Sequence, residues 1–234
     1  MAGRTALRSL GEIAKAAERV FTAKGYRATG ISDVATALGL SHGALYTYVQ
    51  NKEALLYLAF LAAIRSADLD GLTVPVTVPA EEGVVELARG WAEEHAGFPV
   101  MTAAAARRRP RSAHDEFGAV VDELYGFIED NRTILGLAEQ CAGEMPQMFQ
   151  FYFVRGRRQL LDTLTSYLET RVGAGQLREV PDVAVAARFV IETIAWFAWH
   201  RLGDLDSAML ADEPARATVR HLLLAAFVPT GGTS

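Results

Sequence analysis

The chain has 234 residues, of which 50% are hydrophobic and 22% charged, and its formal net charge is −5 at pH 7. This composition is typical of a folded globular protein and excludes a disordered or fibrous chain. No apolar run approaches the roughly 20 residues of a membrane-spanning helix, and residues 1–10 lack a signal-peptide core, so we expect a cytoplasmic protein.

Helical periodicity dominates the first part of the chain. Gly25 and Gly39 follow periodic apolar runs and are natural left-handed caps, whereas Ser41 and Asn51 are suitable N-caps. These signals predict four helices: residues 7–24, residues 31–38, about six to eight residues after Ser41, and residues 52–65.

Residues 71–79, GLTVPVTVP, contain two prolines and alternate Val with Thr, which indicates a connector or a brief extended segment, and we favour the connector. Helical spacing resumes at Val84 and falters at residues 96–100. Strand patterns do not persist, so the predicted fold class is all-α. Further helices are predicted at residues 115–130, 132–141, 148–172, 182–202 and 213–227.

Positive charge is concentrated near the N-terminus. Residues 1–52 contain seven Lys or Arg and three Asp or Glu, hence about +4, while the remainder contains 16 basic and 25 acidic residues. This asymmetry favours a small DNA-facing head, residues 1–52, on an acidic body. A second basic run, from Arg107 to Arg111, could contact nucleic acid, but a solvated loop or helix end is the favoured interpretation.

The second and third predicted helices, joined by a short turn that contains Gly39, indicate a helix-turn-helix. Leu45 and Val49 lie four residues apart and are expected to face the core. The opposite side of the third helix then carries small and polar residues that suit close approach to a DNA major groove: His42, Gly43, Ala44, Tyr46 and Thr47.

Residues 12–56 resemble the DNA-binding head of the tetracycline-repressor (TetR) type transcriptional regulators. The resemblance rests on many residue types at fixed spacings, which makes it far more specific than a short motif. The matching positions are Phe21, Gly25, Tyr26, Thr29, Ala35, Gly39, Leu40, Ser41, Gly43, Leu45, Tyr46, Tyr48, Val49, Lys52, Glu53, Leu55 and Leu56.

The resemblance implies a homodimeric, all-helical regulator, in most cases a repressor, whose head binds a palindrome-like operator. It implies that Thr29, Tyr46, Tyr48 and Lys52 hold phosphates. The full set of DNA-binding residues expected from it is Thr29, Ser32, Ser41, His42, Gly43, Ala44, Tyr46, Thr47, Tyr48 and Lys52. Two departures matter: Gly30 replaces a Thr or Ser cap, and His42 stands where Lys is frequent, so no relative's operator can be borrowed.

The resemblance also implies three ranges: a DNA-binding domain at residues 1–52 with a linking helix from 52, an effector-binding and dimerisation domain at 53–228, and a flexible tail at 229–234. Met and aromatic groups suit a largely apolar small-molecule effector. The candidate effector residues are Trp91, Phe98, Met101, Phe127, Met145, Met148, Phe149 and Tyr152, although most such residues pack in a core.

The predicted helix at residues 182–202 carries apolar residues over a wide arc, which calls for two packing partners, and the resemblance adds the last predicted helix to one of them. The family resemblance assigns one of these sides to a second copy of the chain, as in a symmetric apolar interface. The residues expected at this dimer interface are Phe189, Ile194, Phe197, Val219, Leu222, Leu223 and Ala226.

Two other classes of function are compatible with an all-helical chain. The head could be a vestige on a protein that only binds a small molecule or a protein partner, which the intact tyrosines and the positive head disfavour. An enzyme is disfavoured because no Ser/His/Asp grouping, Gly-rich phosphate loop or paired carboxylates are present, and we expect no cofactor. The single Cys141 offers no disulfide or metal site, and a buried apolar role is favoured over redox sensing.

Overall fold

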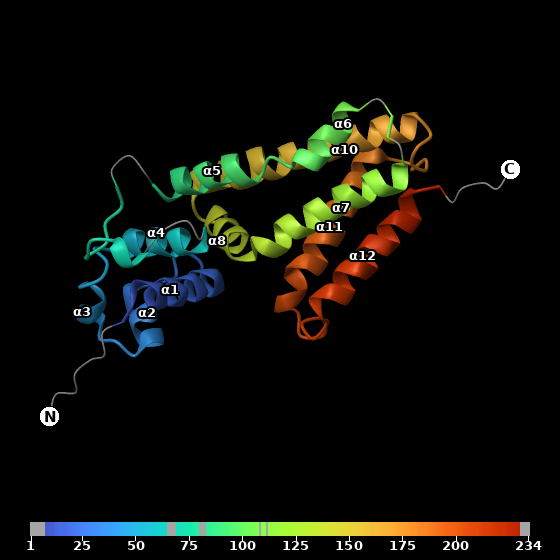
Figure 1. Ribbon diagram of the computed structural model, residues 1–234. Coiled ribbons are helices and arrows are strands. Elements are labelled where there is room, and N and C mark those ends of the chain that lie inside the picture. Colours follow the sequence, from blue (N-terminus) through green and yellow to red (C-terminus); the bar gives the residue numbers. More distant parts are fainter. Residues whose placement is uncertain (1–7, 65–68, 80–82, 108, 111, 230–234) are drawn as a thin grey trace. The chain divides into compact units, whose positions relative to one another are not determined.

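The computed structural model describes residues 8–64, 69–79, 83–107, 109–110 and 112–229, and helices make up most of them (Figure 1). The all-α prediction is confirmed: within these residues the strand-like pairing is an isolated parallel bridge between Val49 and Val76. No helix among the described residues has the length and apolar character needed to cross a bilayer. The predicted tail at 229–234 lies outside the described residues except for Pro229.

The chain divides into two compact units, which we describe one at a time. The first contains residues 1–94 and 133–154, and the second contains residues 95–132 and 155–234. The first unit is built from α1 (Leu10–Lys24), α2 (Ile31–Leu38), α3 (His42–Leu45), α4 (Lys52–Ala63), a 3-10 turn (Leu69–Gly71), α5 (Val84–His95), α8 (Arg132–Ala142) and α9 (Pro146–Phe149).

Helix α1 begins at a capping box. The Ser9 hydroxyl accepts from the Glu12 backbone N–H at 3.1 Å, and the Glu12 carboxylate accepts from the Ser9 N–H at 2.9 Å. This pair satisfies two donors that the helix start leaves open, so the helix begins at Leu10 rather than at the predicted residue 7. Leu7 itself lies outside the described residues.

Helices α2 and α3 form the predicted helix-turn-helix. Gly39 ends α2 in the left-handed region at φ 67°, where a residue with a Cβ is strained. Gly30 gives α2 no side-chain acceptor, so only the other half of a capping box remains, in which the Asp33 carboxylate accepts from the Gly30 N–H at 2.7 Å. Helix α3 has four residues, fewer than predicted, because the chain from Tyr46 onward continues as turns.

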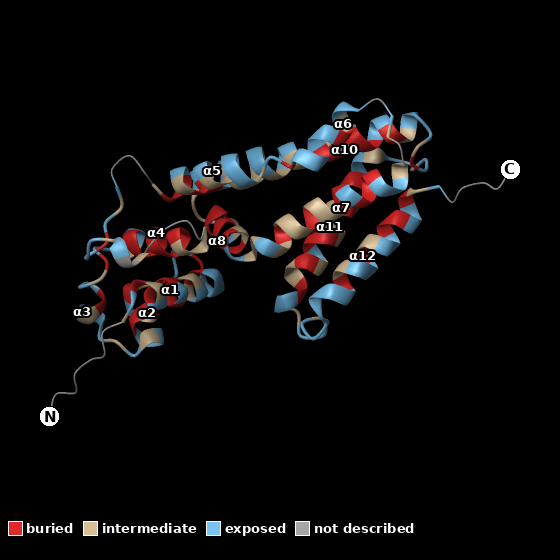
Figure 2. Ribbon diagram, viewed as in Figure 1, coloured by how far each residue is buried: buried red, intermediate tan, exposed pale blue. Residues whose placement is uncertain are grey.

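Helix α4 explains why the first unit extends beyond the head. Residues 54–61 of α4 are all buried, and the helix reads red along most of its length in Figure 2. A helix buried on every side needs neighbours on every side. Helix α1 covers one side, and the shared core also takes in Val85 of α5 and Leu137 of α8. The compact unit around the head therefore does not end at residue 52.

The second unit is built from α6 (Pro99–Ala106), α7 (Ala113–Asp130), α10 (Arg158–Gly173), α11 (Val183–Ala198), a 3-10 turn (His200–Gly203) and α12 (Asp212–Phe227). Helix α7 packs against α6, α11 and α12, and α10 packs against α6 and α11. The continuous helix predicted at residues 148–172 is interrupted, since residues 150–157 form wider π-helical turns before α10. Helix α11 stops at Ala198, earlier than predicted.

A buried arginine, Arg171, joins three helices of the second unit. The Arg171 side chain is fully buried and donates to the Glu116 carboxylate at 2.7 Å, to the Ala104 carbonyl at 2.7 Å and to the Arg107 carbonyl at 3.0 Å. One guanidinium therefore joins α7 and the C-terminal end of α6 to α10. Such a group is stable inside a protein because the charge is paired and most of its N–H donors are satisfied.

Candidate nucleic-acid interface

Helix α3 and the turn after it have one buried and one open side. Leu45 and Val49 are completely buried, as their four-residue spacing predicts. Exposed side chains occupy the other side: His42, Tyr46 and Thr47 are exposed, and so is Gly43. The segment therefore presents small and polar groups outward from a fixed apolar base.

Local contacts arrange this open side. The Ser41 hydroxyl caps α3 by accepting from the Ala44 N–H at 3.2 Å. The Thr47 hydroxyl donates to the Ala44 carbonyl at 2.7 Å, which leaves its oxygen lone pairs and its methyl group available to a ligand. The His42 and Tyr46 rings meet edge to face, with centroids 5.2 Å apart. Two aromatic side chains on the open side thus support each other's orientation.

Helix α3 and the turn after it, residues 42–50, are called the recognition segment, and Tyr48 connects this segment to Arg8 near the start of the described chain. Its hydroxyl oxygen accepts from the Arg8 backbone N–H at 3.1 Å, so its own proton can still be donated to an acceptor such as a phosphate. The Arg8 guanidinium donates to the Leu38 carbonyl at 3.1 Å, at the end of α2. Arg8 was not singled out from the sequence, because an isolated arginine before a helix carries no pattern.

The structure corrects the expected role of Thr29. Its side chain is 1% exposed, and its hydroxyl donates to the Gly25 carbonyl at 2.7 Å. A hydroxyl that is buried and already donating has no proton to offer a phosphate. Thr29 therefore closes the loop between α1 and α2 from inside the head and does not contact a phosphate through its hydroxyl.

Lys52 is the first residue of α4, and its side chain contacts the loop between α1 and α2. Its ammonium donates to the Tyr26 carbonyl at 2.7 Å and to the Arg27 carbonyl at 3.3 Å, and it lies 4.4 Å from the centroid of the Tyr26 ring. An ammonium has three N–H donors. Two therefore brace the loop between α1 and α2, and the third can reach a phosphate.

Glu144 braces the same loop from the α8–α9 turn. Its carboxylate accepts from the Arg27 N–H at 2.5 Å, and its backbone carbonyl accepts from the Arg27 guanidinium at 3.3 Å. A Cβ built on Gly25 would lie 2.7 Å from the Glu144 carboxylate, and Gly25 has a positive φ of 84°. The backbone conformation favours glycine there, and a larger residue would also displace the end of the Glu144 side chain. No local sequence signal links Glu144 to the head.

The predicted dimer residues fall into two groups. Phe189 and Leu222 are 56% and 59% exposed, Ala226 is exposed, and Phe197 is partly exposed. The prediction is wrong for the remaining three residues, because their side chains are buried in the protomer's own core and offer no surface to a partner. These residues are Ile194, Val219 and Leu223. The exposed apolar stripe on α11 also includes Val185 and Trp196.

The predicted effector residues are divided between the two units. Five belong to the first unit: Trp91, Met145, Met148, Phe149 and Tyr152. Three belong to the second unit: Phe98, Met101 and Phe127. The rings of Phe98 and Phe127 are in contact, with centroids 4.9 Å apart, and Met101 and Met148 are buried in core packing. Phe149 is instead 44% exposed.

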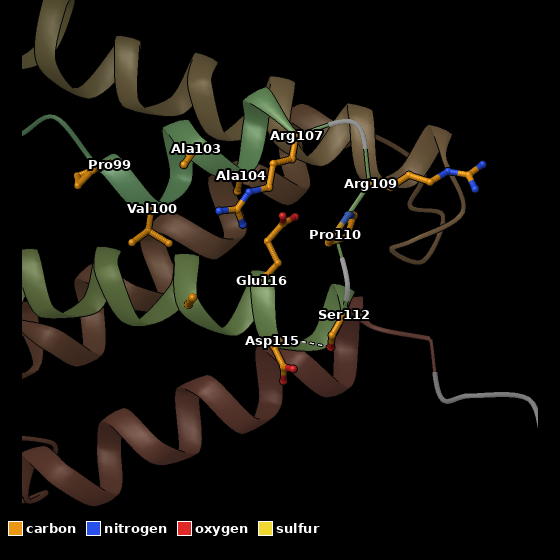
Figure 3. Close-up of a pocket in the computed structure, with 11 residues that line it drawn as sticks. Pro99, Val100, Ala103, Ala104, Arg107, Arg109, Pro110, Ser112, Asp115 and Glu116 are labelled. Carbon is orange, nitrogen blue, oxygen red and sulfur yellow. Dashed lines mark hydrogen bonds between the residues drawn. The ribbon is translucent and has the colours of Figure 1, made fainter.

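A cavity of about 800 Å³ lies in the second unit between α6 and α7 (Figure 3). None of the predicted effector residues lines it. Its walls combine small apolar with charged groups: Pro99, Val100, Ala103, Ala104, Arg107, Arg109, Pro110, Ser112, Asp115, Glu116 and Ala119. Arg107 and Glu116 project toward the space between the two helices, whereas Arg109 points away from it. Sequence periodicity missed this cavity because most of its apolar residues are alanine and proline.

Two family profiles match the chain. Residues 13–57 match bacterial regulatory proteins of the tetR family, and residues 129–225 match the C-terminal domain of AefR-like transcriptional repressors. Together with the helix-turn-helix geometry, these matches define the class of protein as a helix-turn-helix transcriptional regulator. The chain belongs to the tetR family, and its N-terminal domain binds DNA. No curated protein matches the sequence.

Solved structures show the same fold. A tetR-family regulatory protein from Rhodococcus RHA1 is 20% identical, with 96% of this chain and 100% of that chain covered and a TM-score of 0.52. The ketosteroid transcriptional regulator KstR2 of Mycobacterium tuberculosis is 15% identical, with 98% and 99% covered and a TM-score of 0.57. The regulator PfmR of Thermus thermophilus is 23% identical, with 96% and 100% covered and a TM-score of 0.50.

Proposed function

We propose that this protein is a transcriptional repressor that binds a palindrome-like operator as a homodimer and is released from it by a small effector. The observation that carries the proposal is the open polar side of α3 and the turn after it, where His42, Tyr46 and Thr47 are exposed while Leu45 and Val49 are completely buried. A short helix with this division is suited to lie in a major groove. Because the partner is DNA, we propose that the protein acts in the cytoplasm.

The contacts divide into those that position and those that read. For phosphates we propose the hydroxyls of Tyr46 and Tyr48, the third N–H of Lys52, and the exposed hydroxyls of Ser32 and Ser41. For base edges we propose the residues on the open side of α3: His42, Gly43, Ala44 and Thr47. Gly43 supports this assignment because a Cβ built there meets no protein atom within 4 Å, so its open space faces outward.

For dimerisation we propose the exposed apolar stripes of α11 and α12. Val185, Phe189 and Trp196 on α11 are 66%, 56% and 44% exposed, and Leu222 on α12 is 59% exposed. Large apolar groups gathered on neighbouring helices are typical of a surface that a second copy covers. The symmetric pair would place two α3 segments in successive major grooves, about 34–36 Å apart.

For the effector we propose the cavity between α6 and α7. Its small apolar wall residues and the exposed Arg107 suit a small molecule that is largely apolar with one polar end, while Glu116 is already paired with Arg171. An effector that lowers operator affinity a hundredfold must favour the released conformation by about 2.7 kcal/mol. Burial of an apolar ligand of modest size is sufficient for that preference.

Enrichment of duplexes from a random library by the purified protein tests the proposal. We expect a near-palindrome whose half-sites lie about one helical turn apart. His42→Ala should change which sequence is enriched, whereas Ser32→Ala should weaken binding to every duplex alike. A preparation that retains no duplex even at low salt would overturn the proposal, and so would enrichment of a single half-site by a monomer.

A further inference from the structure

The segment after α4 returns to the end of the recognition segment. We call residues 72–79 the return segment. Its Val76 N–H donates to the Tyr48 carbonyl at 2.7 Å, and the Gln50 N–H donates to the Val76 carbonyl at 2.9 Å. These bonds form the parallel bridge between Val49 and Val76, and the Val76 side chain is 3% exposed in the core of the first unit.

This bridge meets a structural need of the recognition segment. Helix α3 has four residues, far too few to be stable by itself. Beyond it the chain makes turns, in which the Tyr48 and Val49 N–H groups donate back to the Leu45 carbonyl. Two further main-chain groups at the segment's end, the Tyr48 carbonyl and the Gln50 N–H, are bound by the return segment instead.

We propose that Val76 is a positioning residue for DNA recognition. Its two main-chain hydrogen bonds fix the backbone on both sides of Val49, and thereby the direction in which Tyr46 and Tyr48 leave the head. The proposal rests on the DNA binding described above and deepens it, because it assigns part of the binding geometry to a connector that follows α4.

The return segment is uncharged, and this allows an experiment to distinguish a positioning role from a direct contact with DNA. Residues 71–79 contain no charged side chain, so the segment neutralises no phosphate. Direct phosphate contacts by basic groups change the salt dependence of binding, because they release counterions. A loss of positioning should instead lower the affinity for the preferred sequence and leave the salt dependence unchanged.

The experiment compares two proline variants that each remove one backbone N–H from the return segment. Val76→Pro removes the donor to Tyr48, whereas Thr77→Pro removes a neighbouring N–H at an exposed residue. The probes are a duplex enriched by the unmodified protein from a random library and a duplex of random sequence.

We expect Val76→Pro to bind the enriched duplex about five- to tenfold more weakly, the equivalent of one net hydrogen bond. Its affinity for the random duplex should fall by less than about twofold, and its salt dependence should not change. Thr77→Pro should stay within about twofold of the unmodified protein on both probes. Equal losses in the two variants would mean that the return segment itself touches DNA, which overturns the proposal, as would full affinity of Val76→Pro.

If Val76→Pro does not fold, amide hydrogen exchange on the unmodified protein tests the positioning role of Val76 instead. The Val76 and Gln50 amides should exchange as slowly as that of Leu55 inside α4, and the enriched duplex should slow them further while the random duplex does not. Fast exchange of both amides, or no response to the enriched duplex, overturns the proposal. A protein that enriches no duplex at all contradicts the proposed function instead, so the two failures are distinguishable.

Discussion

The backbone N–H of Arg27 donates to the Glu144 carboxylate at 2.5 Å across 117 residues of sequence. The contact joins the loop between α1 and α2 to the turn between α8 and α9, both within the first unit. Lys52 holds the same loop from α4 through the Tyr26 and Arg27 carbonyls. The loop that precedes the helix-turn-helix is therefore fixed from two sides by charged groups rather than by its own secondary structure.

Removal of the Glu144 side chain should loosen this loop. We expect Glu144→Ala to lower the free energy of unfolding by about 1–2 kcal/mol, because the Arg27 N–H loses a charged acceptor. Glu144→Gln should recover part of that loss, since its amide oxygen can still accept. Urea denaturation measures both, with the exposed Glu93→Gln as the control. Unchanged stability of the alanine variant would show that the contact contributes nothing.

Thr29 and Thr36 offer a matched pair for separating stability from DNA binding. Both hydroxyls donate at 2.7 Å to a backbone carbonyl four residues earlier, but Thr29 is buried and Thr36 is exposed. Thr29→Val should cost about 1–3 kcal/mol of stability by leaving the Gly25 carbonyl unpaired, whereas Thr36→Val should cost little. Duplex affinity of the folded Thr29 variant should stay within about twofold, and a selective loss of affinity would restore the phosphate role first expected of it.

Gly43 tests how closely the duplex approaches α3. A Cβ on Gly43 meets no atom of the protein within 4 Å, and the same holds for Gly90 on α5. Gly43→Ala and Gly90→Ala should therefore both keep or slightly raise stability, as expected for alanine in a helix. We expect only Gly43→Ala to weaken duplex binding, by about tenfold, because its methyl group would enter the space that the duplex occupies in the complex. Equal duplex affinities in the two variants would place the duplex elsewhere.

The sequence was sufficient for features that depend on periodicity. The four-residue spacing of Leu45 and Val49 correctly predicted the buried side of the recognition segment, and the caps at Gly39 and Ser41 were correctly located. The role expected of Thr29 is wrong, because a shared residue type does not say which way its hydroxyl points. In the structure that hydroxyl points inward.

Other features could not be read from the sequence because they depend on contacts between distant residues. Val76 lies in a segment with two prolines and no helical period, so only the folded chain shows its pairing with Tyr48. On the last two helices, Ile194 and Phe189 are both large and apolar. Their hydrophobicity alone does not reveal that one fills the protomer core and the other faces outward.

Cys141 should be unreactive in the native protein. Burial raises the pKa of its thiol to about 12, and the charge of Glu144 adds to the effect. At pH 8 the thiolate fraction is then lower than in the unfolded chain by about a thousandfold. We expect a thiol reagent to label the protein in urea but not in buffer. Because the native pKa lies above the unfolded value, stability should fall as pH rises from about 9 toward 12. Rapid native labelling at pH 8 contradicts this prediction.

The exposed stripe on α11 leads to a prediction about assembly. Phe189 is 56% exposed on the protomer and lies between Val185 and Trp196 on the same helix. A carboxylate introduced there would lose its hydration if a second copy covered the stripe, and nothing on the protomer's apolar stripe can compensate it. We therefore expect Phe189→Glu to raise the dimer dissociation constant by at least about a hundredfold, as measured by sedimentation equilibrium.

The matched control for this prediction is Val74→Glu, which places the same charge on an exposed apolar residue of the first unit, 51% exposed. It should leave the dimer intact, since it lies outside the stripe. Duplex binding then links assembly to function: the Phe189 variant should keep its fold but lose preference for a site with two half-sites over a site with one, because separate monomers gain nothing from the second half-site. A monomeric variant that still distinguishes the two duplexes would show that α11 does not pair the heads.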